Sequence, residues 1–295
     1  MMKKQTVGLV IAAALFAGSQ AQAQFTYASD DLLLNFRDVS ATTDPDVTVD
    51  VGNVTTFVNT ITALPGGTAV LDTVTGVTPT SGYTATFSGD AIMGTSGLYG
   101  QAASGNIVGL TAVAGFPGVS GTHILWLTRQ ITAPDPTGSS STPSSQQANT
   151  GFQASTANII RTVGTNAGIS GTRLANSSAN AVTVASGNAS SFQTKAQASG
   201  NPGLINFNGN QPVQGNQASL ELQQDGSGAF YSALWEVPPT GSGSDTYEGY
   251  FTFQPSGEVD FTAAASVPEP STYALLGLSA FAGFAFRRKI RALVA

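Results

Sequence analysis

Two segments near the start of the chain alternate between apolar and polar residues, as strands with a buried face do. In residues 32–37 every second side chain is large and apolar, namely Leu32, Leu34 and Phe36. In residues 47–51 three valines alternate with polar residues. The first segment therefore predicts a strand with one buried face. The second predicts a half-exposed strand that pairs with it as a hairpin.

The apolar period changes to that of a helix directly after these strands. Asn53 is a suitable N-cap, and Pro65-Gly66-Gly67 ends the pattern. The apolar residues at helical spacing are Val54, Phe57, Val58, Ile61 and Leu64. They predict a short amphipathic helix, which we expect to cover an open end of the β fold.

Strand-like segments then recur along the chain between clusters of Gly and Pro. These segments are residues 83–88, 107–114, 123–130, 181–185, 204–207, 218–222, 229–237, 250–254 and 259–263. The last two flank the turn-like Gln254-Pro255-Ser256-Gly257 and place Phe251, Phe253, Val259 and Phe261 on one buried face. This pattern predicts an all-β fold, a jelly-roll-like β-sandwich with one or two short helices.

Two segments interrupt the series of strands. Residues 131–155 are mostly Thr, Ser, Pro and Gln. They cannot bury enough apolar area to offset the entropy of ordering, so we interpret them as a long surface loop. Such a loop could divide two subdomains, but one continuous sandwich is the simpler interpretation, because strands are equally dense on either side. Residues 157–166 fit either a helical turn or a strand, and the pattern does not decide between them.

Charge and cysteine content narrow the function classes. All but one of the 17 acidic residues lie within residues 24–266, which contain only five of the 11 basic residues. An acidic surface repels phosphate backbones, which argues against nucleic acid as a partner. Cysteine is absent, so disulfide bonds, thiolate nucleophiles and Cys-based zinc sites are excluded.

One group of acidic residues is a candidate cation site. Asp44, Asp46 and Asp50, with Asp38 nearby, could supply oxygen ligands to Ca²⁺. They lack the spacing of an EF-hand, and the alternative is that they are ordinary acidic turn residues. No other cofactor is indicated.

Catalytic groups are sparse. Glu221 and Glu236, both on predicted strands, could be the acid and base of a glycoside hydrolase if they faced one cleft, although exposed carboxylates on strands are ordinary. The single histidine, His123, opens an apolar strand and has no G-x-S-x-G motif to support it, so we interpret it as structural. We therefore predict no catalytic residues.

Aromatic residues could bind sugars by stacking. Trp126 and Trp235 are candidates, but Trp235 shares its face with Tyr231, Ala233 and Val237, which indicates a core position. Tyr250 is the ring that we expect to be exposed.

The N-terminus resembles a secretory signal. Lys3 and Lys4 precede a short apolar run, and Ala21 and Ala23 form an A-x-A cleavage site. Residues 1–23 are therefore predicted to be a helical signal peptide that the export machinery recognises and signal peptidase removes. The alternative is a short anchor helix that stays attached. The mature body would span residues 24–266.

The C-terminus combines a Pro-Glu-Pro sequence (Val267, Pro268, Glu269 and Pro270), an apolar run and a basic end. The run, residues 271–286, is slightly shorter than the roughly 17 to 25 residues of an ordinary spanning helix. We expect a short transmembrane helix, supported by snorkelling side chains and local thinning, with its basic end in the cytoplasm. Its anchoring residues are Tyr273, Leu275, Leu276, Leu278, Phe281, Phe284, Phe286, Arg287, Arg288, Lys289 and Arg291.

In this order, these three features resemble the PEP-CTERM sorting tail of exported bacterial proteins. The resemblance covers residues 267–295 only. It implies processing near Pro268-Glu269-Pro270 by an exosortase-type membrane protease and transfer through the inner membrane to the cell surface or extracellular matrix. It also implies association with exopolysaccharide and biofilm.

Three function classes remain for the body. We favour a non-catalytic surface or extracellular-matrix protein. The second class is a carbohydrate-binding module, which an exposed aromatic platform or a Ca²⁺ site would distinguish. The third is a secreted glycoside hydrolase, which requires carboxylates that converge in a cleft.

Overall fold

The computed structural model describes residues 25–39, 41, 43–74, 87–94, 96–100, 107–116, 123–139, 150–197, 221–239 and 243–265. The strands in these ranges are β1 (Asp31–Asp38), β2 (Asp46–Asn53), β3 (Thr68–Val70), β4 (Asp72–Thr73), β5 (Phe87–Ser88), β6 (Val108–Phe116), β7 (Ile124–Ile131), β8 (Thr172–Arg173), β9 (Ala181–Val184), β10 (Leu222–Gln224), β11 (Phe230–Val237), β12 (Thr246–Phe253) and β13 (Val259–Ala263). The helices are α1 (Val54–Thr62), α2 (Gly89–Met93), α3 (Thr150–Ser170) and α4 (Phe192–Gln197), with a 3₁₀ turn at Pro65–Gly67.

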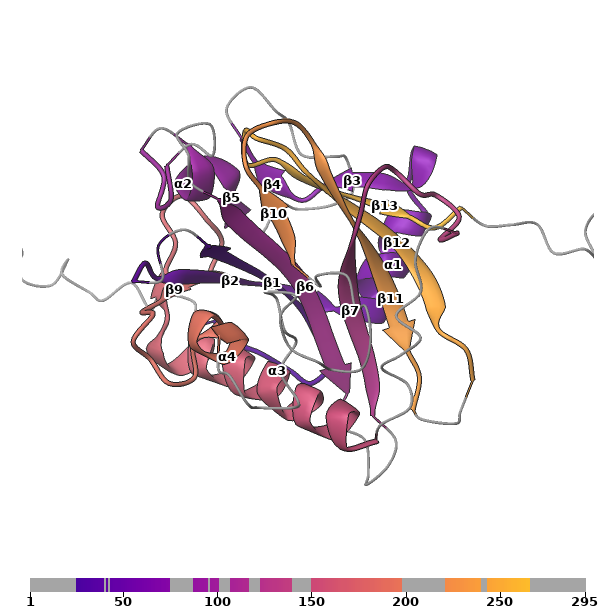
Figure 1. Cartoon of the computed structure of the whole chain (residues 1–295), viewed down its shortest axis with the longest axis horizontal. Helices are drawn as coiled ribbons and strands as arrows, with labels where there is room; N and C mark the ends of the chain where they lie inside the picture. Colours follow the sequence, from indigo (N-terminus) through magenta and orange to yellow (C-terminus); the bar gives the residue numbers. More distant parts are fainter. Residues whose placement is uncertain are drawn as a thin grey trace, which may run out of the picture.

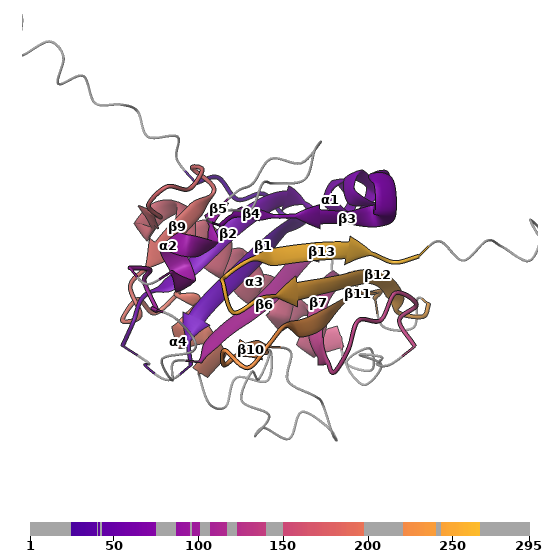
Figure 2. The same cartoon turned by 90° about the horizontal axis from the view of Figure 1, so that it is seen from above.

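Eleven of the strands form one antiparallel sheet. Its order is β3-β13-β12-β11-β7-β6-β1-β2-β9-β8, and β10 pairs beside β6. The sheet curls, so that β12 and β13 share one core with β1 and β2, as Figure 1 and Figure 2 show. The two halves of the sheet act as the layers of a sandwich. This confirms the predicted all-β, sandwich-like class.

Aromatic side chains fill the inner face of the curled sheet. The ring centroid of Phe36 on β1 lies 5.3 Å from that of Phe87 and 5.9 Å from that of Phe253 on β12. Phe251 and Phe261, on neighbouring strands, are 4.8 Å apart. These rings come from both halves of the sheet, so the alternation of apolar residues along β1, β12 and β13 produces the inner core.

Helix α1 closes one side of this core. The Asn53 side chain accepts a hydrogen bond from the Thr56 amide at 2.9 Å, and a 3₁₀ turn follows the helix at Pro65–Gly67. Phe57 lies 5.0 Å from the Phe261 ring, and the helix packs on β2, β3 and β13. The predicted helix, its N-cap and its end are therefore confirmed.

Helix α3 covers the outer face of the same sheet, against β6, β7 and β9 (Figure 1). Its buried side consists of Ala157, Ile160, Val163 and Ala167. Residues 157–166, which the pattern left open, are thus helical. The predicted surface loop 131–155 is wrong at both ends, because Ile131 is the buried last residue of β7 and α3 begins at Thr150. Packing of the small and apolar side chains on the sheet stabilises a helix that composition alone did not indicate.

Two strand predictions need correction, and a third concerns residues that the structure does not describe. Strand β2 is not half-exposed, because Thr48 and Asp50 on its second face are buried where α3 and α4 pack. In the segment 83–88, the described strand is only Phe87–Ser88, after which α2 begins. Strand β10 begins at Leu222, and residues 204–207 lie outside the described ranges.

Candidate functional site

The predicted terminal signals lie outside the described residues. They comprise the cleavage site at Ala21 and Ala23, the Pro-Glu-Pro sequence from Val267 to Pro270, and the apolar run 271–286 with its basic end. Within the described ranges, no helix is long and apolar enough to cross a membrane. The structure therefore describes the body of the protein, whereas the two terminal signals are known from their sequence alone.

The three aspartates of the candidate cation site are not brought together. Asp46 and Asp50 lie at different positions along β2, where Asp46 pairs with Val184 and the Asp50 amide donates to the carbonyl of Asn180. Asp50 is instead beside Asp31, with which it shares a side-chain hydrogen bond. Among the described residues, which include all three aspartates, no group of three or more His, Cys, Asp or Glu side chains could hold a metal ion.

Glu221 is held in a buried ion pair. Its two carboxylate oxygens accept hydrogen bonds from Nε of Arg37 at 2.5 Å and from Nη2 at 2.7 Å. Glu221 is 0% exposed and Arg37 1% exposed. The pair packs over Gly109, where a Cβ atom would collide with the Glu221 side chain. Glu221 therefore has no access to a substrate, and its role is to neutralise Arg37 inside the fold.

Glu236 is brought next to Glu248, a residue that the sequence analysis did not single out. The two side chains share a hydrogen bond. Burial, and then the negative charge of Glu236, raise the pKa of Glu248 to about 7. Two carboxyl groups in direct contact leave no room for a glycosidic bond between them, since glycosidases separate theirs by roughly 5 to 9.5 Å. The alternative in which Glu221 and Glu236 face one cleft is therefore not supported, because Glu221 pairs with Arg37 and Glu236 with Glu248.

The histidine and the tryptophans occupy structural positions. Trp126 is 6% exposed within the inner core. Trp235, 5% exposed, packs on the outer face with its ring 5.0 Å from that of Tyr247. His123 directly precedes β7, and its buried Nδ1 has no hydrogen-bond partner among the described residues. None of the three presents a side chain to an open site.

Partly exposed tyrosines extend this outer-face cluster. Tyr231 and Tyr250 pack beside Trp235 and Ala233. Their ring centroids are 6.3 Å apart and their planes meet at 69°. Tyr250 is thus partly exposed, as expected, but the two rings do not form a flat platform.

Buried carboxyl groups are the feature that sequence reasoning missed. Burial, and then the nearby charge of Asp31, raise the pKa of Asp50 to about 7. Burial likewise raises the pKa of Asp72 to about 8. Asp72 accepts a hydrogen bond from the Val259 amide at 3.0 Å, while its Oδ2 has no partner in the described part of the chain. No local pattern marks these positions, because their protonation depends on which strands cover them.

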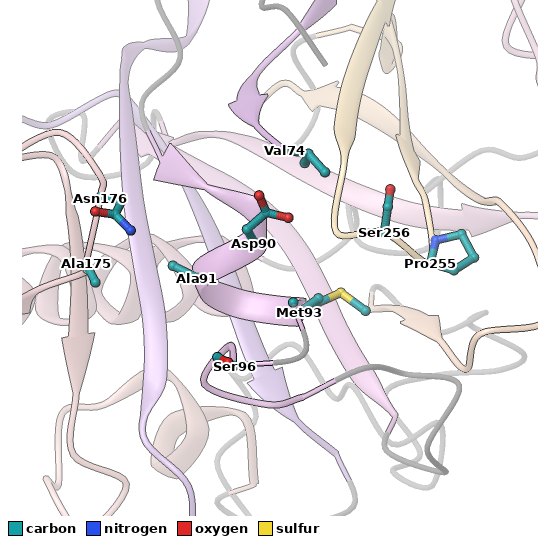
Figure 3. A pocket seen from close by; sticks show the side chains of 10 residues that line it. Val74, Asp90, Ala91, Met93, Ser96, Ala175, Asn176, Pro255 and Ser256 are labelled. Carbon is teal, nitrogen blue, oxygen red and sulfur yellow. The ribbon is translucent and has the colours of Figure 1, made fainter. Parts of the chain in front are cut away.

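A cavity of about 650 Å³ lies between four separate segments of the body. Figure 3 shows helix α2 in its centre, with the β12–β13 turn on one side and the loop between β8 and β9 on the other. Asp90 points toward Val74 and Ser256, and the Met93 side chain extends toward Pro255 (Figure 3). The volume of the cavity falls within the range of small-molecule sites, roughly 300 to 1,000 Å³. The cavity is the candidate binding site of the body.

The comparisons decide the nature of the C-terminal tail. Residues 266–289 match the PEP-CTERM protein-sorting motif. The chain is thus an exported protein that is sorted through a membrane-anchored stage and processed by exosortase, a membrane protease. No curated protein and no solved structure matches the chain. The motif lies C-terminal to the described body, so it assigns the route of the protein and leaves the role of the body to its own geometry.

Proposed function

We propose that, after removal of its two terminal signals, the body is a non-catalytic component of the cell surface or extracellular matrix that associates with exopolysaccharide and biofilm. The observation that carries this proposal is the PEP-CTERM motif at residues 266–289. The A-x-A site at Ala21 and Ala23 supports export in the same direction. The motif supports this destination, and so does the composition of the body, which is rich in Ser, Thr and Gly and suits neutral, hydrogen-bonding surroundings such as polysaccharide.

The geometry of the carboxylates supports a non-catalytic role over a hydrolase. Glu221 is neutralised by Arg37, and Glu236 contacts Glu248 directly. Neither arrangement holds two carboxylates across a cleft at the separation that glycoside hydrolysis requires. Polysaccharide turnover by the purified protein that Glu236→Gln abolishes would overturn this part of the proposal.

A carbohydrate-binding module is the second candidate. The partly exposed rings of Tyr231 and Tyr250 on the outer face favour it, because single aromatic rings can stack on sugar faces. In this case Tyr250→Ala would lower the fraction of protein retained by the polysaccharide of the producing cells. If Tyr250→Ala is retained as well as the wild type, the Tyr250 ring does not bind the polysaccharide.

The sorting step is tested by changing Pro268, Glu269 and Pro270 together to Ala. We expect the variant to remain unprocessed in the inner membrane, because the protease no longer recognises its site. Mass spectrometry of membrane and surface fractions measures the C-terminus of each form. A matched variant with Ser271 and Thr272 changed to Ala should be processed normally. A normal mature C-terminus in the Pro-Glu-Pro variant would contradict sorting through this sequence.

A further inference from the structure

The walls of the cavity beside α2 are fixed by direct contacts. The Ser88 amide donates to Oγ of Ser177 at 2.9 Å, which joins the start of α2 to the β8–β9 loop. Gly89 touches the β12–β13 turn so closely that a Cβ atom there would collide with the carbonyl of Gly257. The amides of Leu98 and Tyr99 donate to carbonyls of α2 at 2.8 and 2.9 Å. The cavity is therefore preformed, which lowers the entropy that a ligand must lose on binding.

Asn176 is held in an unusual backbone conformation at this wall. Its φ is 55°, in the left-handed region that asparagine tolerates better than most residues. The side chain is exposed and lines the same cavity as Asp90. Figure 3 shows its amide on the far side of Ala91 from the Asp90 carboxylate. One wall thus offers an amide and the other a carboxylate.

The chemistry of the lining fits a neutral ligand with several hydroxyl groups. Asp90 accepts hydrogen bonds, Asn176 both donates and accepts, and the hydroxyls of Ser96 and Ser256 do either. Val74, Met93 and Pro255 supply apolar surface between these polar groups. A sugar ring presents the same mixture, with hydroxyls at its edge and C–H groups on its faces.

Charged ligands fit this lining poorly. None of the described residues that line the cavity is basic, so the carboxylate of Asp90 would repel an anionic group. Divalent cations prefer several oxygen ligands, whereas Asp90 is the single carboxylate among the described residues of the lining. The remaining class is an uncharged polyol.

We propose that this cavity binds one neutral hexose unit of a polysaccharide, with Asp90 and Asn176 as the hydrogen-bonding residues that orient it. This inference rests on the proposed association with polysaccharide and assigns it to a site other than the outer tyrosines. Because the described residues of the lining include no aromatic ring, we assign affinity and selectivity to the hydrogen bonds with Asp90 and Asn176.

Saturation-transfer NMR on the full chain in detergent micelles tests the proposal, with glucose, galactose and mannose as probes. Glucuronate is the matched anionic probe, because it differs from glucose only at C6. We expect at least one neutral hexose to bind, and to bind at least tenfold more tightly than glucuronate. Asp90→Asn should weaken hexose binding roughly tenfold, because hydrogen bonds to charged groups are the stronger ones. Asp90→Asn should also reduce the ratio of the affinity for the neutral hexose to the affinity for glucuronate.

Two further variants keep the test decisive. Asn176→Gly removes the amide without straining the left-handed backbone, and we expect a loss of hexose binding similar to that in Asp90→Asn. Asp225→Asn, an exposed change outside the cavity lining, should bind as the wild type does. Absence of binding by all three hexoses, equal binding of glucuronate, or unchanged binding in Asn176→Gly would each overturn the proposal.

The test separates this inference from the proposed function. If the exported protein is found with the polysaccharide and both cavity variants are retained as well as the wild type, the proposed function stands and the cavity is not its site. If the wild type is not found with polysaccharide, the proposed function fails, while hexose binding in solution still decides whether the cavity is a sugar site.

Discussion

The two ends of strand β1 hold buried carboxyl groups in opposite ways. At one end Arg37 pairs with Glu221, and both oxygens of the carboxylate receive a guanidinium hydrogen bond. At the other end Asp31 lies beside Asp50, and burial raises the pKa of both. One carboxylate is neutralised by a cation and the other by a proton. The body has five basic residues and sixteen acidic ones, so some buried carboxyl groups are neutralised by protonation and not by a basic side chain.

Removing the cation should have the largest effect. Arg37→Met leaves the Glu221 carboxylate buried without its ion-pair partner, which costs about 3 to 5 kcal/mol of the free energy of unfolding. Denaturant unfolding of the full chain at pH 7 measures it. The double variant Arg37→Met with Glu221→Leu removes both charges and should regain most of the loss. A midpoint equal to that of the wild type in Arg37→Met would show that the pair contributes little.

The protonated end should respond to pH with a smaller change. The pKa of Asp50 is raised from 3.8 to about 7, so its contribution to stability is complete below pH 3.8 and is lost as the pH rises through about 7. Asp50→Asn cannot ionise, and should therefore stabilise the chain at pH 8 by about 2 kcal/mol, with little change at pH 4. Thermal unfolding at both pH values measures this difference. An equal effect at pH 4 and pH 8 would argue against a protonated Asp50.

The N-cap of α1, close to the Asp31 end of β1, should show the smallest of the three effects. Asn53 caps α1 and donates to Oδ2 of Asp30 at 2.6 Å. Asn53→Ala should lower the free energy of unfolding by about 1 kcal/mol, because the first turn of the helix loses its cap. Asn53→Gly is the matched control and should cost only a few tenths. A loss as large as that of Arg37→Met would mean that Asp30 is coupled to the acidic pair.

Local patterns predicted those parts of the fold that local residues determine. The alternation in β1, the N-cap of α1 and the face of Phe251, Phe253 and Phe261 are each specified within about ten residues, and the structure confirms them. The pattern left residues 157–166 open between helix and strand, because the helical state of α3 depends on the outer face of the sheet, on which side chains such as Ala157 and Ala167 pack.

The candidate site was less predictable than the fold. Glu221 and Arg37 are separated by 184 residues, and no pattern along the chain shows that they meet. The residues that line the cavity likewise come from four separate segments of the chain. In contrast, the sorting motif is contiguous, so the sequence alone was sufficient to find it.

The end of the body has a mechanical consequence for sorting. The amide of Ala264 donates to Glu248 and that of Ala265 to Pro136, each at 2.9 to 3.0 Å, so the body is tied down through its last described residue. Only Ser266 and Val267 separate this point from Pro268-Glu269-Pro270, a reach of about 7 Å at full extension. The sequence that we expect the protease to recognise is therefore only two residues from the folded body. Cleavage at this sequence would release a body with only a few residues beyond its last described hydrogen bond.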